Sequence, residues 1–357
     1  MRARAAQIAA IAIFWLGGIV SASANPALLF EPSTGKVLYS EDVDDVWYPA
    51  SLTKLTTAYI AFEAVRDGKL HLDDKIPCSL IATLQPPSKA GLKVGQTLTV
   101  KQALQAVIVK SANDVTVMLA EAISGSESAF VEKMNATAQR LGMTRTHFDN
   151  TNGLPSPGQL TTARDLAKIA TAVIRDFPEY ASYWSMPAMY IGKRRLGSHN
   201  ALLRTFEGAD GMKTGFTCDS GYNVAATATR DGHRLMAIVL GESSGNERAL
   251  RSAALLEYGF QDYAWKDYFK MPTLDTLPAD PDAKGIRSVR ESVAAWSCRD
   301  HQHHTAKHKH HKRKKSKVTA SKKDATGESA ARPSAKGTAH AAGETAAAAP
   351  KAANAAP

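Results

Sequence analysis

Three short motifs carry residue types that could do covalent chemistry. In chain order they are Ser51-Leu52-Thr53-Lys54, Ser111-Ala112-Asn113 and Lys213-Thr214-Gly215. A serine hydroxyl becomes a nucleophile when a neighbouring base takes its proton, and a lysine can be that base if its pKa is lowered. The first motif therefore predicts a Ser51 nucleophile with Lys54 as its base.

Each motif alone is weak evidence, because short patterns of common residues recur by chance. Ser33 and Lys36 also fit the S-x-x-K pattern, and three further segments fit S-x-N: Ser23-Ala24-Asn25, Ser198-His199-Asn200 and Ser244-Gly245-Asn246. Only the Lys213-Thr214-Gly215 motif is unique in the chain. Context must therefore choose among the others.

The local setting separates the two S-x-x-K segments. Ser33 lies in a predicted turn, whereas Ser51 begins an amphipathic helix. There the helix dipole and free N–H groups surround the hydroxyl, and Lys54 follows one turn later on the same side. A lone serine at this position is more often only a helix cap. The ordered occurrence of all three motifs favours the catalytic interpretation.

Hydrophobic periodicity predicts the elements that must position these motifs. Hairpins are expected at 27–30 with 37–39 and at 222–229 with 234–240, the second around Arg230-Asp231-Gly232. Helices are expected from Pro49 to near Asp67, and then at 101–122, 127–141, 162–175 and 246–258. Strands at both ends with helices between predict an α+β fold, in which distant segments complete one sheet and a helical part is inserted.

The charge of the chain is unevenly distributed. The formal net charge is +10, but residues 301–357 hold 12 of the 44 basic and 3 of the 34 acidic side chains. The region before them is close to neutral, so the high isoelectric point says little about the substrate of the folded part. An apolar fraction of 44% is enough for a sizeable core and excludes wholesale disorder.

The N-terminal residues 1–24 predict a signal peptide. Arg2 and Arg4 precede an apolar stretch, and Ala22 and Ala24 give the small-x-small pattern before Asn25. An uncleaved membrane anchor is the alternative, although the stretch is short for a span. Three cysteines, Cys78, Cys218 and Cys298, fit no metal or disulfide framework. In an exported protein two of them could pair, and the sequence does not say which.

The C-terminal part changes composition twice. Residues 272–285 are rich in proline and predict a linker, 286–298 could form one short helix, and 301–357 form a basic tail rich in His, Lys and Ala. The domain prediction is a catalytic domain at 25–264, a linker at 265–300 and a disordered tail. The tail is interpreted as a solvated extension, or as a segment attracted to anionic wall polymers or a membrane surface. Nucleic acid is disfavoured because no aromatic residue interleaves the charges.

Tail histidines could bind a transition metal loosely, but no ordered metal site and no cofactor follow from the sequence. The seven are His301, His303, His304, His308, His310, His311 and His340.

The ordered set of motifs resembles a known family, the penicillin-binding proteins and serine β-lactamases, which carry S-x-x-K, S-x-N and K-T-G in this order. It is most similar to the low-molecular-mass D-alanyl-D-alanine carboxypeptidases, over about residues 25–264. Further segments support the resemblance: Tyr48-Pro49-Ala50, Phe148 to Leu154, Gly211-Met212 and Leu255 to Phe260. The resemblance implies a mostly antiparallel sheet flanked by helices, with an inserted helical subdomain.

The resemblance also implies roles for individual residues. Ser51 would attack the D-alanyl-D-alanine carbonyl, with Lys54 as base, while Ser111 and Lys213 would relay the proton to the leaving amine. Asn113 would hold the substrate's amide carbonyl, and the N–H groups of Ser51 and Phe216 would form the oxyanion hole.

Recognition of the terminal carboxylate would fall to Thr214 and Arg248. An exposed helical arginine is the alternative for Arg248. Gly215 would let the substrate backbone lie against the strand.

Two features depart from the family pattern. Phe216 stands where some members carry a histidine, which leaves the deacylation rate open. Many members also have a C-terminal β-rich domain and an amphipathic membrane helix, and residues 265–357 predict neither, so we expect no terminal membrane anchor.

The functional prediction is an exported, periplasmic or wall-associated serine carboxypeptidase that trims peptidoglycan stem peptides and is acylated by β-lactams. Three alternatives keep the same residues. A D,D-endopeptidase would cut cross-links, a β-lactamase would deacylate penicillin quickly, and a non-catalytic wall-binding protein would use the fold for recognition. The complete set of Ser51, Lys54 and Lys213 argues against the last, because binding does not need proton transfer.

Overall fold

The computed structural model describes residues 25–262, 270–293 and 298. The predicted signal peptide and basic tail lie outside these residues. The chain divides into a unit spanning residues 1–300 and a unit spanning 301–357, and the fold below is that of the first.

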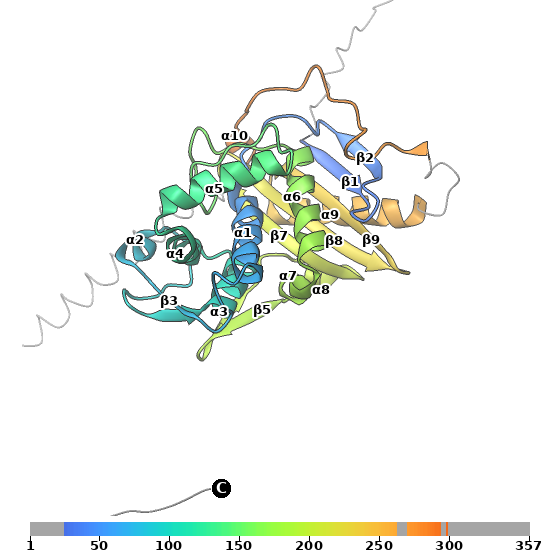
Figure 1. Cartoon of the computed structure of the whole chain (residues 1–357). Helices are drawn as coiled ribbons and strands as arrows, with labels where there is room; N and C mark the ends of the chain where they lie inside the picture. The colour runs from blue at the N-terminus through green and yellow to red at the C-terminus, as the bar shows by residue number, and fades with distance from the viewer. Residues whose placement is uncertain (1–24, 263–269, 294–297, 299–357) are drawn as a thin grey trace, which may run out of the picture. The chain divides into compact units, whose positions relative to one another are not determined.

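A five-stranded antiparallel sheet is the centre of this unit (Figure 1). Its strand order is β2-β1-β9-β8-β7, so the two ends of the folded chain meet in one sheet. The strands are β1 (Ala27–Phe30), β2 (Val37–Glu41), β7 (Ala209–Thr217), β8 (Gly221–Arg230) and β9 (His233–Glu242). The structure confirms both predicted hairpins. In the second, Asp231 and Gly232 both have positive φ, as a two-residue turn between twisted strands requires.

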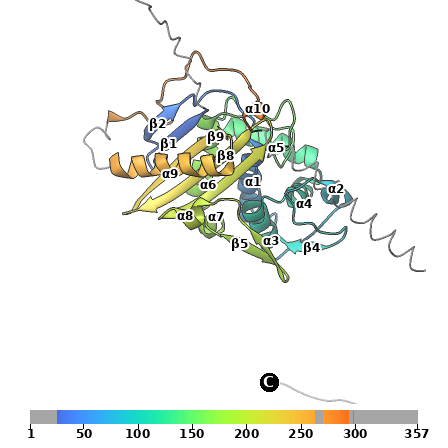
Figure 2. The ribbon, with the colours of Figure 1, turned by 180° about the vertical axis from the view of Figure 1, so that it is seen from behind.

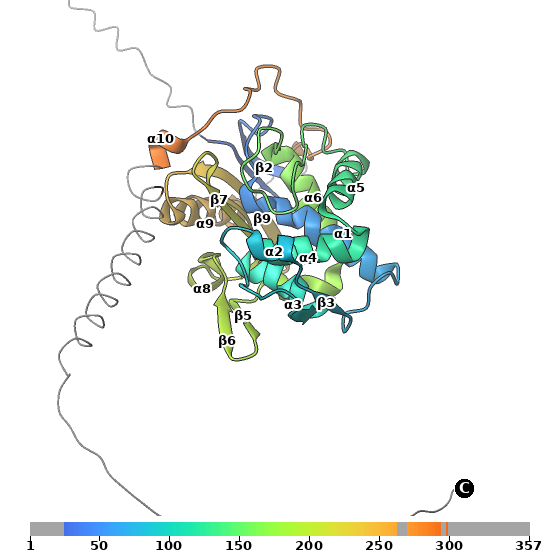
Figure 3. The same cartoon turned by 90° about the vertical axis from the view of Figure 1, so that its left-hand side faces the viewer.

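The alternating side chains of the sheet pack into two different hydrophobic cores, one on each face. Ala27 and Leu29 face helix α9 (Gly245–Asp262), whereas Leu28 and Phe30 face α6 (Ala163–Asp176) and α1 (Lys54–Arg66). This alternation follows from the two-residue period of a strand. Figure 2 shows α9 lying across one face of the sheet, and Figure 3 shows α6 and α1 on the opposite side.

Most other helices form the inserted part, on the side of the sheet that carries α1. It contains two two-stranded sheets, β3 (Lys75–Pro77) with β4 (Thr97–Thr99) and β5 (Ala188–Ile191) with β6 (Arg194–Gly197). Its six α-helices are α2 (Leu80–Leu84), α3 (Val100–Gln105), α4 (Asn113–Ser124), α5 (Glu127–Arg140), α7 (Ala181–Trp184) and α8 (Leu202–Thr205). The predicted α+β class, with an antiparallel sheet and an inserted helical subdomain, is confirmed. Among the described residues no helix has both the length and the apolar character needed to cross a membrane.

The continuous helix predicted at 101–122 was wrong. Helix α3 continues into a π-helical turn at Ala106–Lys110 and stops at Ser111, whose φ of 60° is left-handed, before α4 begins at Asn113. Periodicity cannot reveal such a break, because the residues on both sides are apolar and buried. Single π turns within helices often mark functional sites.

The C-terminal strap, residues 270–293, returns to the sheet instead of leaving it. Leu274 N donates to Gly35 O at 2.9 Å, and Val289 N donates to Asp219 O at 3.1 Å. The strap ends in the short helix α10 (Arg290–Val293). A disulfide joins Cys218, in the β7–β8 turn, to Cys298, and Cys78 is a buried free thiol. The segment expected to be a linker is thus held along the unit that contains the sheet.

Candidate active site

The first Ser–Lys pair is formed within one helical turn. Ser51 lies in a short 3-10 turn, Ala50–Thr53, and Lys54 is the first residue of α1. Lys54 Nζ lies 2.8 Å from Ser51 Oγ. The alternative role of Ser51 as a helix cap receives no support, because neither helix start has a side-chain capping bond.

Lys54 occupies an enclosed position with defined partners. Its side chain is fully buried, and Nζ also contacts Asn113 Oδ1 at 2.8 Å and the Asn152 carbonyl at 2.6 Å. Burial and the nearby positive charge of Lys213 hold the pKa of Lys54 well below its usual value, although Asp114 opposes this. A neutral amine has two N–H bonds and one lone pair. It can donate to Asn113 and Asn152 and still accept the Ser51 proton.

The second Ser–Lys pair is built from distant segments. Lys213, on β7, donates to Ser111 Oγ at 2.9 Å and to the Thr214 carbonyl at 2.7 Å. Both side chains are buried. The left-handed conformation of Ser111 ends the helix at this residue. A non-glycine residue in that conformation costs free energy, which the surrounding structure must offset.

Arg248 adds a third basic residue to the site. It is buried, with Nη2 donating to the His199 carbonyl at 3.1 Å and the guanidinium lying 5.8 Å from the centre of the Tyr222 ring. This burial excludes the alternative that Arg248 is only an exposed arginine on a helix. Burial lowers the pKa of Arg248 to about 10, so it stays charged at neutral pH. Burial and the charge of Arg248 lower the pKa of Lys213 to about 7.

Strand β7 presents a free edge beside Ser51. It is the last strand of the sheet, paired on one side with β8. A Cβ added to Gly215 would lie 3.0 Å from the Ser51 nitrogen and 3.0 Å from the Pro49 carbonyl. A side chain here would push the strand and the nucleophile turn apart by a few tenths of an ångström, so the close packing favours glycine. An edge strand can pair with an extended peptide. Thr214 is buried in this strand, and the Phe216 ring stacks on Tyr222 with centres 4.1 Å apart.

A pocket of about 220 Å³ adjoins the nucleophile turn. Pro49 and Ala50 form one wall, Leu154 and Pro155 a second, and Thr217 at the end of β7 a third. The pocket is large enough for a side chain of a peptide bound along β7.

The competing motif matches have other, local functions. Asn200 donates to the Gly211 carbonyl and accepts from Leu202 N, so it supports the start of β7. Ser244 Oγ accepts from Glu247 N at the beginning of α9. Ser33 lies exposed in the β1–β2 turn.

Sequence reasoning missed two residues of this site. Asn152 acts through its backbone carbonyl, which no side-chain motif can reveal. His199 appeared only as part of a chance S-x-N match. Partial burial and the charges of Lys213, Lys110 and Arg248 lower the pKa of His199 to about 4, although its side chain keeps an exposed edge. It lies at the border of the site, where its backbone carbonyl accepts from Arg248.

Taken together, the site combines a serine–lysine pair, a second serine–lysine pair and a buried arginine at the edge of a sheet. The excess of cations favours an anionic ligand, and a free carboxylate is the simplest one. The arrangement suits acyl transfer from a peptide that has a terminal carboxylate.

Comparison with known proteins identifies the family. The Peptidase_S11 family model, described as D-alanyl-D-alanine carboxypeptidase, matches residues 18–244. The carboxypeptidase DacF of Bacillus subtilis is 34% identical over 69% of this chain and 64% of its own length. DacC of Escherichia coli is 35% identical over 74% and 65%. The chain therefore belongs to the D-alanyl-D-alanine carboxypeptidase family, and it spans just under two thirds of these two relatives.

Solved structures agree on the fold. Penicillin-binding protein 5 of Haemophilus influenzae has a TM-score of 0.65 and 36% identity, covering 67% of this chain and 71% of that one. Penicillin-binding protein D2 of Listeria monocytogenes, in a cefotaxime-bound form, has a TM-score of 0.61 and 34% identity, covering 67% and 97%. The D,D-transpeptidase of Streptomyces K15 has a TM-score of 0.63 and 27% identity, again covering 67% and 97%.

Proposed function

We propose that this protein is a serine D-alanyl-D-alanine carboxypeptidase, which removes the terminal D-alanine from peptidoglycan stem peptides through an acyl-enzyme. The observation that carries the proposal is the contact between a buried lysine of lowered pKa and a serine, at 2.8 Å, inside a site that holds two further cations. Family membership supports the same reaction.

In the first half-reaction, Ser51 Oγ attacks the carbonyl carbon of the D-alanyl-D-alanine bond and its proton passes to neutral Lys54. The developing oxyanion accepts hydrogen bonds from the N–H groups of Ser51 and Phe216, a contribution of about 3 kcal/mol for each donor. Collapse of this intermediate breaks the C–N bond. The leaving amine takes a proton from Ser111, which recovers one from the Lys54 and Lys213 network.

In the second half-reaction, water attacks the acyl-enzyme and Lys54 again serves as base, which frees the shortened peptide and restores Ser51. Arg248, Lys213 and Thr214 would hold the terminal carboxylate, and Asn113 an amide carbonyl of the substrate. A β-lactam would acylate Ser51 in the same way, with its own carboxylate in the cation-rich part of the site. The pocket beside Leu154 would take a side chain of the stem peptide.

Export of the protein is part of the proposal. Residues 1–24 have the pattern of a signal peptide. The Cys218–Cys298 disulfide supports an oxidising compartment such as the periplasm or the cell surface. The basic tail is proposed to attract anionic wall polymers. Deleting residues 301–357 should leave peptide hydrolysis intact and weaken sedimentation with purified wall at low salt. Equal sedimentation of both forms would contradict the tail proposal.

The test of the proposed activity follows free D-alanine released from an uncross-linked pentapeptide by the purified chain. Wild type should release D-alanine, and Ser51→Ala should release none. Ser33→Ala is the matched control, because Ser33 fits the same motif but lies in a surface turn. Cleavage of a cross-linked dimer alone would instead indicate a D,D-endopeptidase. Rapid penicillin turnover would indicate a β-lactamase, and no Ser51-dependent reaction would indicate a wall-binding protein.

A further inference from the structure

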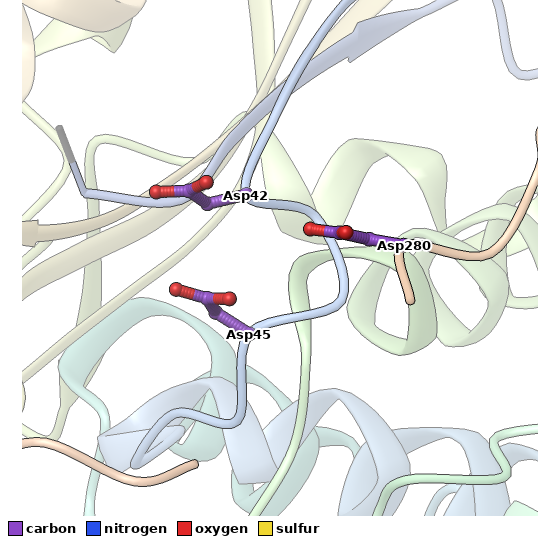
Figure 4. A group of neighbouring side chains, drawn as sticks. All are labelled: Asp42, Asp45 and Asp280. Atoms are coloured by element: carbon purple, nitrogen blue, oxygen red, sulfur yellow. The ribbon is translucent and has the colours of Figure 1, made fainter. Parts of the chain in front are cut away.

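Three carboxylates converge on the side of the molecule where the strap crosses the loop after β2. Asp42 and Asp45 belong to that loop, and Asp280 belongs to the strap. One oxygen of each lies within 4.8 Å of the others. Figure 4 shows Asp280 pointing from the strap toward the loop, where the Asp42 and Asp45 side chains lie near each other. Three negative charges at such separations repel one another unless a cation lies among them.

Asp45 is the carboxylate of this cluster whose hydrogen bonding is incomplete. Its side chain is 1% exposed, and Oδ1 accepts a hydrogen bond from Lys284 N at 2.7 Å. Its second oxygen, Oδ2, is buried and has no hydrogen-bond partner among the residues that the structure describes. A buried carboxylate oxygen without a donor is costly, so such an atom points to a missing ligand.

The neighbouring cations do not balance this cluster. Lys284 Nζ lies 3.7 Å from Asp42, which is a long ion pair with a half-exposed side chain. Arg164 is close by, but its guanidinium forms a double hydrogen bond with Asp44 at 2.6 and 2.8 Å. Arg145 donates to the Asp44 carbonyl. Within the described part of the chain, Asp45 and Asp280 have no ion-pair partner.

We propose that Asp42, Asp45 and Asp280 bind one calcium ion. The ligands are all oxygens, with no histidine or cysteine among them, which is typical of hard cations and disfavours zinc or copper. Calcium accepts irregular oxygen sets completed by water, whereas magnesium demands a regular octahedron. Asp42 and Asp280 are partly exposed, so the ion has a path from solvent.

The position of the site gives it a structural consequence. Asp45 lies six residues before Ser51, and Asp280 lies in the middle of the strap. Backbone bonds already join the two segments, since Val46 N donates to the Lys284 carbonyl at 3.0 Å. A bound ion would fasten the strap to the segment that leads into the nucleophile turn. The inference is independent of the proposed reaction, because none of these residues belongs to the catalytic set.

The test is a calorimetric titration of the full chain, stripped with chelator, with calcium chloride and separately with magnesium chloride. We expect one calcium site with a dissociation constant of about 0.1–1 mM, as in exported calcium-binding modules. Asp45→Asn keeps the acceptor for Lys284 N and should weaken binding at least tenfold. Asp275→Asn removes the same charge from an exposed position of the strap, and binding should be unchanged.

A third variant keeps the proposal testable if Asp45→Asn fails to fold. Lys284→Gln removes the competing ammonium and should bind calcium several-fold more tightly than wild type. Calcium should also slow tryptic cleavage after Lys284 and Arg287 in the wild type. The proposal is overturned if wild type shows no saturable calcium binding, if Asp45→Asn and Asp275→Asn bind alike, or if magnesium binds as tightly as calcium.

Discussion

The two serine–lysine pairs of the candidate active site have similar geometry but different origins. Lys54 and Ser51 are separated by three residues and 2.8 Å, and Lys213 and Ser111 by 102 residues and 2.9 Å. Both lysines are buried, yet their surroundings differ. Lys213 feels the charge of Arg248, and Lys54 feels that of Lys213. Each basic residue thus disfavours the charged form of the next, in the order Arg248, Lys213 and Lys54. Lys54 is the lysine best placed to be neutral.

This difference suggests different roles for the two lysines. Lys54 is suited to accept a proton, because burial and Lys213 disfavour its charged form. Lys213, with a pKa of about 7, is poised between its two forms and would gain its proton when a carboxylate binds beside it.

The largest effect is expected for Lys54→Met, which keeps the length of the side chain and removes the base. Acylation by a fluorescent penicillin should slow by about 10³- to 10⁴-fold, in the upper range for loss of a general base. Lys36→Met is the control, since Lys36 belongs to the competing motif in the β1–β2 turn. A loss below tenfold would mean that Lys213, and not Lys54, takes the Ser51 proton.

Arg248→Gln should raise KM for the pentapeptide by about 10- to 100-fold, because a charge-assisted hydrogen bond to the substrate carboxylate is lost. An amidated pentapeptide should show a much smaller change. Arg251→Gln is the control on the same helix, where Arg251 pairs with Glu41 and Glu242. Equal losses with both peptides would limit Arg248 to a structural role in the packing of this part of the site.

Lys213→Arg tests the charge of the second pair through pH. In wild type, kcat/KM should fall above pH about 7, because Lys213 loses its proton there, and each further pH unit lowers the charged fraction about tenfold. Arginine stays protonated, so this alkaline limb should disappear in the variant. The acidic limb, set by protonation of Lys54, should remain. A wild-type profile that is flat from pH 7 to 9 would contradict the role of Lys213.

Cys298→Ser should have the smallest effect on activity, below about twofold. The disulfide closes a loop with a sequence separation of 80, and its removal should cost about 4.5 kcal/mol in the free energy of unfolding by the chain-entropy model. Chemical denaturation measures the loss, with Cys78→Ser as the free-thiol control. A large loss of activity would show that the tether at the end of β7 also positions Lys213.

Much of the fold could be predicted from local patterns. The two hairpins follow from alternating strands and turn residues, and the helical stretch formed by the 3-10 turn at Ala50–Thr53 and α1 runs from Pro49 to Asp67 as the apolar spacing indicates. The Ser51–Lys54 contact is likewise local, because one helical turn brings residues three apart to the same side. For these features the chain itself supplies the geometry.

Only the tertiary structure decided the remaining features. The helix break at Ser111, the carbonyl of Asn152 and the burial of Arg248 depend on segments that are distant in sequence. The same holds for the choice of Cys218 and Cys298 as the disulfide pair and for the meeting of Asp280 with Asp45. The physical reason is common to all of them. A pKa, a desolvated charge or a bond between distant groups depends on what the folded chain packs around it, and residue spacing records only what lies nearby along the chain.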